Sequence, residues 1–384
     1  MRAAMLHEDD VARRSWGLGD DSTEPPRPPL PAGSDTNDAA AYVVYALGAA
    51  RRSPREASRA FYWASRLDPS RADALYGRFA MLGELVGGGY HIVDHRARYD
   101  PGLSPAASRH IDSLMYFALV RDPFLNDRLS YEPPPTDSFY LKRRLKDPLF
   151  AGMLAYSEGH FREAAAKLGE ALRKRPNSIT LRVGRAHALY YVAQYDSAIA
   201  ELSRAIATIE THEQEDIGRV YISKEMFHYA IGMIDARLGE LDSARLEYQR
   251  AIAENLGFYM AHARLAGVDL VSGDTATALV ELRTAAEIQP DDPALRYYLG
   301  YTLLQAGRVD DAAAELREAL RLDRHWAAPH EALGRALAAR GDTTGAAAEY
   351  TEYLAHAPRS AALADDVRAR LAALGRGGST GSRE

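Results

Sequence analysis

The sequence predicts an all-α protein in which helix–turn–helix repeats stack into an α-solenoid behind a flexible N-terminal arm. The first observation behind this prediction is that residues 145–360 repeat at a spacing of 34 residues, broken by one insertion of 12 residues. The second observation is that small, bulky and turn-forming residues recur at fixed places in every repeat. A fixed period of this length is typical of a chain built from stacked supersecondary units.

Within each repeat, the first helix carries one small residue, and the second helix carries an alanine and a bulky residue. The small column consists of Gly152, Ala186, Gly232, Ala266, Gly300 and Gly334. The other two columns are Ala164, Ala198, Ala244, Ala278, Ala312 and Ala346, and Leu168, Leu202, Tyr248, Leu282, Leu316 and Tyr350. Small residues on facing helices let the two axes approach closely, and the bulky side chains fill the gap between neighbours.

A further column marks the turn between the two helices of each repeat. It consists of Gly159, Ala193, Gly239, Gly273, Gly307 and Gly341. Glycine at this place supplies the left-handed conformation that ends a helix. Because no single repeat can bury its own apolar stripe, we expect stacking of repeats to provide the stability.

This order of residues resembles the tetratricopeptide repeat. The matching positions are Leu299-Gly300, Leu333-Gly334, Gly307, Gly341, Ala312, Ala346, Leu316, Tyr350, Ala319, Pro176, Pro290 and Pro358. The resemblance covers six repeats between residues 145 and 360 and implies a right-handed superhelix. Three residues depart from the motif, namely Arg185 at a bulky position and Asp235 and Asp269 where an aromatic residue is usual.

The chain before these repeats is less regular. Residues 1–37 contain the proline-rich stretch Pro25–Pro31, which favours a flexible arm, with docking to a proline-reading domain as the alternative. Residues 38–84 predict divergent repeat helices, at 38–52, 54–67 and 71–84. Residues 85–144 predict an irregular insertion in which the apolar run from Ile111 to Leu119 forms a displaced second helix.

Three further segments complete the expected organisation. Asp147 and Pro148 have the residue types of an N-cap and a first helical residue, so the regular array begins there. The insertion at 213–224 predicts extra turns on the first helix of the third repeat. Residues 361–374 predict a helix that caps the last repeat, and 375–384 predict a flexible tail.

Composition excludes several classes of protein. The chain has no cysteine, so it cannot form disulfides, thiolate metal sites or a cysteine nucleophile. Its net charge of −6 argues against a general nucleic-acid binder, which would present a basic face. No stretch approaches the roughly 18 apolar residues of a membrane helix, and the acidic start does not read as a signal peptide. We expect a cytoplasmic protein, or a periplasmic one if a leader has been removed.

Catalytic and metal-binding patterns are weak, so we expect neither enzymatic activity nor a cofactor. The chain contains no Gly-Lys dipeptide, and the nucleophile-elbow string at 377–381 follows no strand. His91 and His95 have the spacing of two metal ligands on a helix, but they follow three glycines. Loop packing explains this pair better than a metal site, which would need a third ligand.

The resemblance also implies where a partner binds, because the first helices of successive repeats line the concave groove. The implied groove residues are Leu149, Met153, Tyr156, Val183, His187, Tyr190, Tyr191, Tyr229, Met233, Arg237, Met260, Tyr297, Tyr301, Leu304 and Arg335. Tyr229, Ala263 and Tyr297 replace the polar residues with which chaperone-binding relatives hold a C-terminal carboxylate. This groove is instead rich in tyrosine and methionine, which suit protein interfaces.

The predicted function is therefore a non-enzymatic scaffold that binds a peptide, a helix or a partner domain in this groove. A helical-repeat RNA-binding protein is one alternative, although the acidic balance and the apolar groove disfavour it. An accessory subunit of an enzyme carried on another chain is the other alternative, since fold alone does not determine function.

Overall fold

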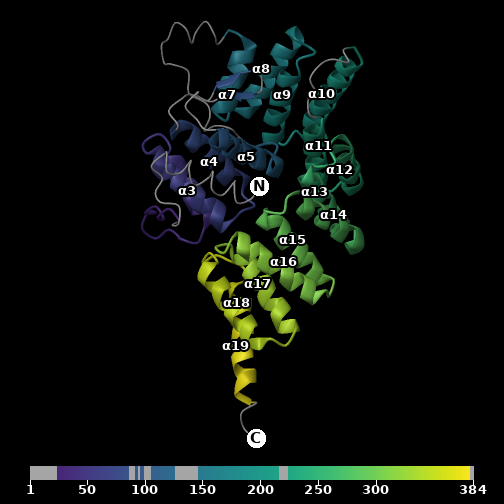
Figure 1. The fold of residues 1–384 in the computed structure, drawn as a ribbon. Helices are drawn as coiled ribbons and strands as arrows, with labels where there is room; N and C mark the ends of the chain where they lie inside the picture. Colours follow the sequence, from purple (N-terminus) through teal and green to yellow (C-terminus); the bar gives the residue numbers. More distant parts are fainter. Residues whose placement is uncertain are drawn as a thin grey trace. The chain divides into compact units, whose positions relative to one another are not determined.

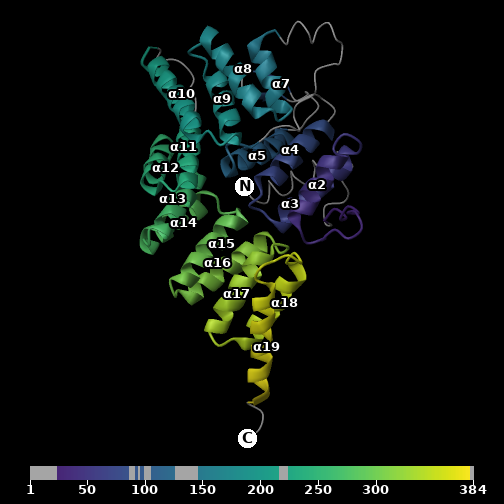
Figure 2. The same ribbon diagram turned by 180° about the vertical axis from the view of Figure 1, so that it is seen from behind.

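A computed structural model gives the structure of the chain. It describes residues 24–85, 91–93, 96–98, 105–125, 146–215 and 224–380. The chain forms two compact units: the first combines Met1–Asp122 with Thr275–Glu384, and the second is Pro123–Asp274. Each unit is built from helices that pack against their neighbours in the chain (Figures 1 and 2).

Within its described residues, the N-terminal part of the first unit contains four helices, and each packs against the next. They are α2 (Ala39–Ala49), α3 (Pro54–Leu67), α4 (Ala72–Leu85) and α5 (Pro105–Arg121). Helix α2 begins after Asp38, whose side chain accepts a hydrogen bond from the amide of Ala40. The first three helices lie where the sequence predicts them, and α5 is the expected displaced helix.

Between α4 and α5 the structure contains a short antiparallel hairpin that the sequence analysis did not predict. Strand β1 (His91–Val93) pairs with β2 (Arg96–Arg98), and His91 lies opposite Arg98. His91 is therefore in a strand, where its spacing to His95 does not produce the helical pair of ligands. His95 itself lies outside the described residues.

The C-terminal part of the first unit contains the last repeats. Its helices are α14 (Thr275–Ile288), α15 (Pro293–Gln305), α16 (Val309–Leu322), α17 (Ala327–Ala339), α18 (Thr343–His356) and α19 (Ala364–Thr380). Figure 1 shows α15 to α18 side by side, from green to yellow, with α19 following them. Helix α19 is the predicted cap, and it continues to Thr380, into the segment predicted as a flexible tail.

The second unit is a run of helix pairs in chain order. Its helices are α7 (Pro148–Ser157), α8 (Phe161–Lys174), α9 (Ile179–Tyr191), α10 (Tyr195–Glu215), α11 (Glu225–Leu238), α12 (Leu241–Glu254) and α13 (Tyr259–Val271). Asp147 caps α7 as predicted, because its side chain accepts a hydrogen bond from the amide of Leu149. The extra turns expected from the 213–224 insertion do not lengthen α11, which is an ordinary 14-residue helix. They lengthen the preceding helix instead, since α10 runs for 21 residues to Glu215.

The repeat columns have the packing roles that their residue types predict. All six residues of the alanine column are completely buried. A Cβ atom added to Gly334 would lie 2.5 Å from the ring of Tyr350, and one added to Gly300 would lie 2.8 Å from Leu316. The small column is therefore small because the bulky side chain of the same repeat already occupies that space.

The expectation of a flexible arm is wrong for residues 24–37. Pro28 is buried, and the indole nitrogen of Trp63 donates a 2.8 Å hydrogen bond to the carbonyl of Pro25. The side-chain amide of Asn37 donates a 2.7 Å hydrogen bond to the backbone carbonyl of Ala355, near the end of α18. A polyproline II segment forms no hydrogen bonds within its own helix, so its backbone polar groups can bond to neighbouring helices. Residues 1–23 lie outside the described part.

Among the described residues, no helix combines the length and apolar character needed to cross a lipid bilayer.

Candidate partner-binding surfaces

Four of the groove residues expected in the second unit, Tyr156, His187, Tyr190 and Tyr191, gather in one aromatic cluster. This cluster consists of Phe124, Tyr156, Phe161, His187, Tyr190, Tyr191 and Tyr195. Three of its members, His187, Tyr190 and Tyr191, lie on the C-terminal half of α9. Counted from Ile179, these are the ninth, twelfth and thirteenth residues of the repeat, which are three of the expected groove positions.

The rings of this cluster meet at distances that favour aromatic pairing. Phe161 and Tyr191 are stacked, with 4.3 Å between ring centroids and an interplanar angle of 13°. Tyr156 meets Tyr191 edge-on at 6.3 Å, and Tyr190 meets Tyr195 at 5.7 Å. Offset stacks and edge-on contacts of this kind add stability beyond the burial of apolar area.

The cluster contains one histidine and has one arginine at its edge, and these two groups differ in their surroundings. Burial lowers the pKa of His187 to about 4, so its imidazole is neutral at pH 7. Arg237 of α11 is exposed, and its Nε donates a 2.8 Å hydrogen bond to the hydroxyl of Tyr195. Its guanidinium also lies 6.0 Å from the ring of Tyr190. The cluster therefore combines an uncharged interior with one cation at its exposed edge.

The sequence analysis did not identify Phe124 or Phe161 as members of this site. Phe161 is the first residue of the second helix of its repeat, and groove residues were expected only on first helices. Phe124 lies in the segment predicted as irregular, where no repeat period marks it. The only available signal was a phenylalanine beside a proline, Pro123-Phe124, and this is too common to identify a site.

The first unit contains a second group of expected groove residues, which we call the C-terminal tyrosine group. It consists of Tyr297, Tyr301, Trp326 and Arg335. Tyr297 packs edge-on against Trp326 at 4.7 Å, whereas Tyr301 is 37% exposed. The guanidinium of Arg335 on α17 lies 5.8 Å from the ring of Tyr301 on α15. An aromatic face and a cation are thus presented next to each other.

Charges around Arg335 leave it weakly paired. Its closest acidic group is Glu331, with 3.9 Å between Nη1 and Oε2, which is too long for a hydrogen bond. Burial raises the pKa of Glu331, which is only 5% exposed and also contacts Arg370 at 3.6 Å. Within the described part of the chain, Arg335 donates no hydrogen bond.

Two of the expected groove residues do not face a groove. Tyr229 is completely buried, and its ring contacts Phe258 at 5.0 Å and Tyr248 at 5.9 Å. Met260 is only 8% exposed. Tyr229 packs against α12 and the residue before α13, which follow its own helix, and Met260 is buried within the second unit. For these two positions the expectation is wrong.

The remaining expected residues are dispersed. Met153 is 49% exposed on α7, while Leu149 packs against the buried side chains of Leu168 and its neighbours. Val183 and Met233 are half-buried on α9 and α11. Leu304 is half-buried on α15 and packs against the core of the last repeats. None of these five is part of the aromatic cluster or the C-terminal tyrosine group.

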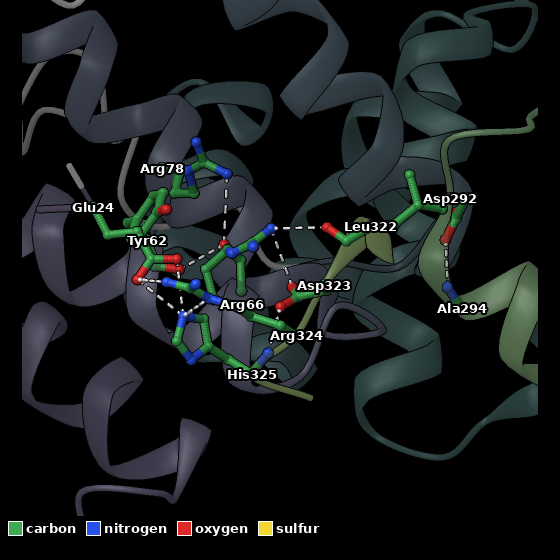
Figure 3. A network of polar contacts seen from close by, with 11 residues as sticks. Glu24, Tyr62, Arg66, Arg78, Asp292, Ala294, Leu322, Asp323, Arg324 and His325 are labelled. Carbon is green, nitrogen blue, oxygen red and sulfur yellow. Dashed lines mark hydrogen bonds and ion pairs between the residues drawn. The ribbon is translucent and has the colours of Figure 1, made fainter. Parts of the chain in front are cut away.

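A polar network lies in the first unit (Figure 3). The carboxylate of Glu24 contacts His325 at 2.8 Å and Arg324 at 3.2 Å. Arg66, near the end of α3, pairs with Asp323 at 3.3 Å, and burial raises the pKa of Asp323 to about 7. These contacts join the arm and α3 to the loop between α16 and α17, so the network is structural.

The described residues contain no group of three or more histidine and acidic side chains placed to hold a metal ion.

Comparisons with known proteins identify the repeat type. Residues 270–336 match the family model described as tetratricopeptide repeat. No curated protein sequence matches the chain. Three solved structures illustrate the similarity in fold, and they are 17–18% identical to the chain in sequence.

The first structure is the crystal structure of the MamA protein. The match covers 48% of this chain and 93% of the MamA chain, with a TM-score of 0.40. The second is YrrB, described as a tetratricopeptide protein with an unusual peptide-binding site, which covers 50% and 93% with a TM-score of 0.41. The third is the C-terminal part of a repeat-containing protein from Cytophaga hutchinsonii, which covers 54% and 78% with a TM-score of 0.45.

Proposed function

The chain carries tetratricopeptide repeats, and from this premise we propose that it is a non-enzymatic scaffold that binds a peptide, helix or partner domain. The observation that carries the proposal is the pairing of Tyr301 and Arg335. The ring of Tyr301 is partly exposed, and the guanidinium of Arg335 beside it has unused hydrogen-bond donors. Exposed tyrosine and arginine are the residue types that most often anchor a protein partner.

The chemistry of this pair suggests how a partner would be held. An apolar side chain of the partner would cover the ring of Tyr301, which offers contact area at little cost in rotamer freedom. A carbonyl or carboxylate oxygen of the partner would accept hydrogen bonds from Arg335. Glu331 is no strong competitor for Arg335, because it lies at 3.9 Å and is shared with Arg370.

The experiment is to capture partners from the source cell and then to titrate the purified partner with the wild type and three variants. We expect Tyr301→Ala and Arg335→Ala each to weaken binding by about tenfold or more, as anchor residues do. Tyr298→Ala is the matched control, because Tyr298 lies on the same helix and is 43% exposed, outside the C-terminal tyrosine group. Both groove variants should fold, since neither side chain is buried.

Equal affinity of the wild type and both groove variants would contradict the proposed site. A loss of affinity in Tyr298→Ala equal to that in Tyr301→Ala would also contradict it. Binding would then depend on any exposed tyrosine of α15 and not on the pair of Tyr301 and Arg335. Turnover of a small molecule by the purified chain would contradict the non-enzymatic assignment.

A further inference from the structure

Phe124 packs against α9 although it belongs to no helix. The residue is completely buried, in a cluster of apolar side chains that includes Ala186, Leu189 and Ile234. It lies in the turn that follows α5, next to Pro123. A non-helical residue thus contributes a ring to a surface that is otherwise made from repeat helices.

The contacts of Phe124 are those of a bound aromatic side chain. Its ring lies parallel to the ring of Tyr190, with 4.0 Å between centroids and an angle of 8°. The imidazole of His187 meets the same ring edge-on at 5.2 Å. The hydroxyl of Tyr191 donates a hydrogen bond to the backbone carbonyl of Phe124. Side chain and backbone are therefore both recognised.

The residues that make these contacts are three of those at which a partner is expected to bind. His187, Tyr190 and Tyr191 are the ninth, twelfth and thirteenth residues of their repeat, counted from Ile179. The site also suits an uncharged ligand, because burial lowers the pKa of His187 and keeps its ring neutral. The apolar side chains around the site would leave a charged side chain of a ligand without a partner.

We propose that His187, Tyr190 and Tyr191 form a binding site for the phenylalanine of an extended peptide, and that Phe124 fills this site within the free protein. The ring of the bound phenylalanine stacks on Tyr190, and its backbone carbonyl accepts a hydrogen bond from Tyr191. This inference rests on the proposed scaffold function and adds the class of ligand, an extended peptide with a phenylalanine. A partner of this kind competes with Phe124 for the site.

The test removes the side chain of Phe124 from the site and then adds a peptide that carries a phenylalanine. The protein is the full chain with Phe124→Ala, and the probe is a labelled peptide with the sequence of residues 119–128, Leu-Val-Arg-Asp-Pro-Phe-Leu-Asn-Asp-Arg. The control peptide has alanine in place of its phenylalanine. We expect the variant to bind the phenylalanine peptide about thirtyfold or more tightly than the control peptide, as for a buried aromatic anchor.

The wild-type protein should bind both peptides weakly, because Phe124 already occupies the site. Adding Tyr191→Phe to the variant should weaken binding of the phenylalanine peptide, since it removes the hydrogen bond to the peptide carbonyl. If Phe124→Ala loses its helical circular dichroism, Phe124→Leu takes its place, because leucine leaves part of the apolar contact intact.

A folded variant that binds neither peptide, or binds both equally, would overturn the inference. This result is distinct from a failure of the proposed scaffold function, which is tested at Tyr301 and Arg335 on a captured partner. The Arg335→Ala variant should bind the phenylalanine peptide normally in the Phe124→Ala background, because the two sites belong to different units.

Discussion

Arg121 and Asp292 are 171 residues apart in the chain, and their side chains form an ion pair with 2.7 Å between Nη2 and Oδ2. Both are nearly buried, with exposures of 10% and 4%. Arg121 is the last residue of α5, and Asp292 caps α15 by accepting a hydrogen bond from the amide of Ala294. This pair therefore holds the N-terminal helices of the first unit to its C-terminal repeats.

We expect Arg121→Met to destabilise the first unit by about 3–5 kcal/mol, because it leaves the carboxylate of Asp292 buried without a cation. Adding Asp292→Asn should recover much of this loss, since asparagine carries no charge and can still cap α15. Urea unfolding, with hydrogen exchange in α5 and α15, measures both effects.

The matched control is Arg308→Met, which breaks the exposed pair between Arg308 and Asp311. This change should cost about 0–1 kcal/mol, as surface pairs do. If Arg121→Met costs no more than Arg308→Met, the buried pair does not hold the two parts of the unit together.

Asp235 gives a prediction about pH. Burial, together with the nearby carboxylates of Glu247 and Glu240, raises the pKa of this carboxyl to about 6. Since its ordinary pKa is about 3.8, the folded protein should lose stability as pH rises from about 4 to about 6. Asp235→Asn removes this loss. We expect no gain at pH 4 and a gain on the order of 2–3 kcal/mol at pH 8.

The control for this experiment is Asp269→Asn, one repeat further along the chain. Asp269 is also buried, but it pairs with Arg245, with 2.9 Å between Nη2 and Oδ1. Removing its charge breaks that pair, so stability at pH 8 should fall. Denaturant midpoints at both pH values measure the two variants, and a gain for Asp235→Asn that is equal at pH 4 and pH 8 would disprove the assignment.

The repeat architecture could be predicted from the sequence because packing dictates residue size. A Cβ at Gly334 would clash with Tyr350, and the same pair recurs at a spacing of 34 residues, as at Gly300 and Leu316. Departures from the motif could not be interpreted in the same way. Arg185 stands at a bulky position because it pairs with the buried Glu201 at 2.6 Å, and no sequence pattern indicates that partner.

The candidate site was predicted only in part, for a related reason. The resemblance implies groove positions for both Tyr190 and Tyr191, and the structure brings them together with Tyr156. The sequence could not reveal that Phe124 packs against the same residues. Phe124 lies outside the helices, so no helical or repeat period predicts its contacts. Tyr229 was misassigned because helical position alone does not tell whether neighbouring elements cover a side chain, and here Tyr248 and Phe258 cover it.

Gly334 and Gly267 predict opposite outcomes for the same substitution. Gly334→Ala places a methyl group 2.5 Å from the ring of Tyr350, so we expect a loss of about 1–3 kcal/mol. A Cβ at Gly267, in α13, meets nothing within 4 Å, so Gly267→Ala should stabilise the helix by about 0.5–1 kcal/mol. Thermal unfolding followed by circular dichroism measures both changes. The same sign for the two variants would show that the small column is not set by packing.

Ala193 is the one residue of the turn column that is not glycine, and it predicts a gain in stability. Its φ angle is 57°, and it is the only non-glycine residue with a positive φ in the described part of the chain. The other turns use glycine with φ between 74° and 84°. The amide of Ala193 donates a 3.0 Å hydrogen bond to the carbonyl of Tyr190, and that of Gln194 donates to Leu189 at 2.9 Å, so the left-handed turn is required here.

We expect Ala193→Gly to stabilise the second unit by about 0.5–1 kcal/mol. Relief of the left-handed conformation contributes about 1–2 kcal/mol, and the greater freedom of glycine in the unfolded chain removes about half of that. The reciprocal change, Gly159→Ala, introduces the same strain at a φ of 79° and should destabilise the unit by a similar amount. Urea midpoints of the two variants, read by tyrosine fluorescence, provide the comparison. A midpoint for Ala193→Gly at or below that of the wild type would mean that the alanine turn carries no strain.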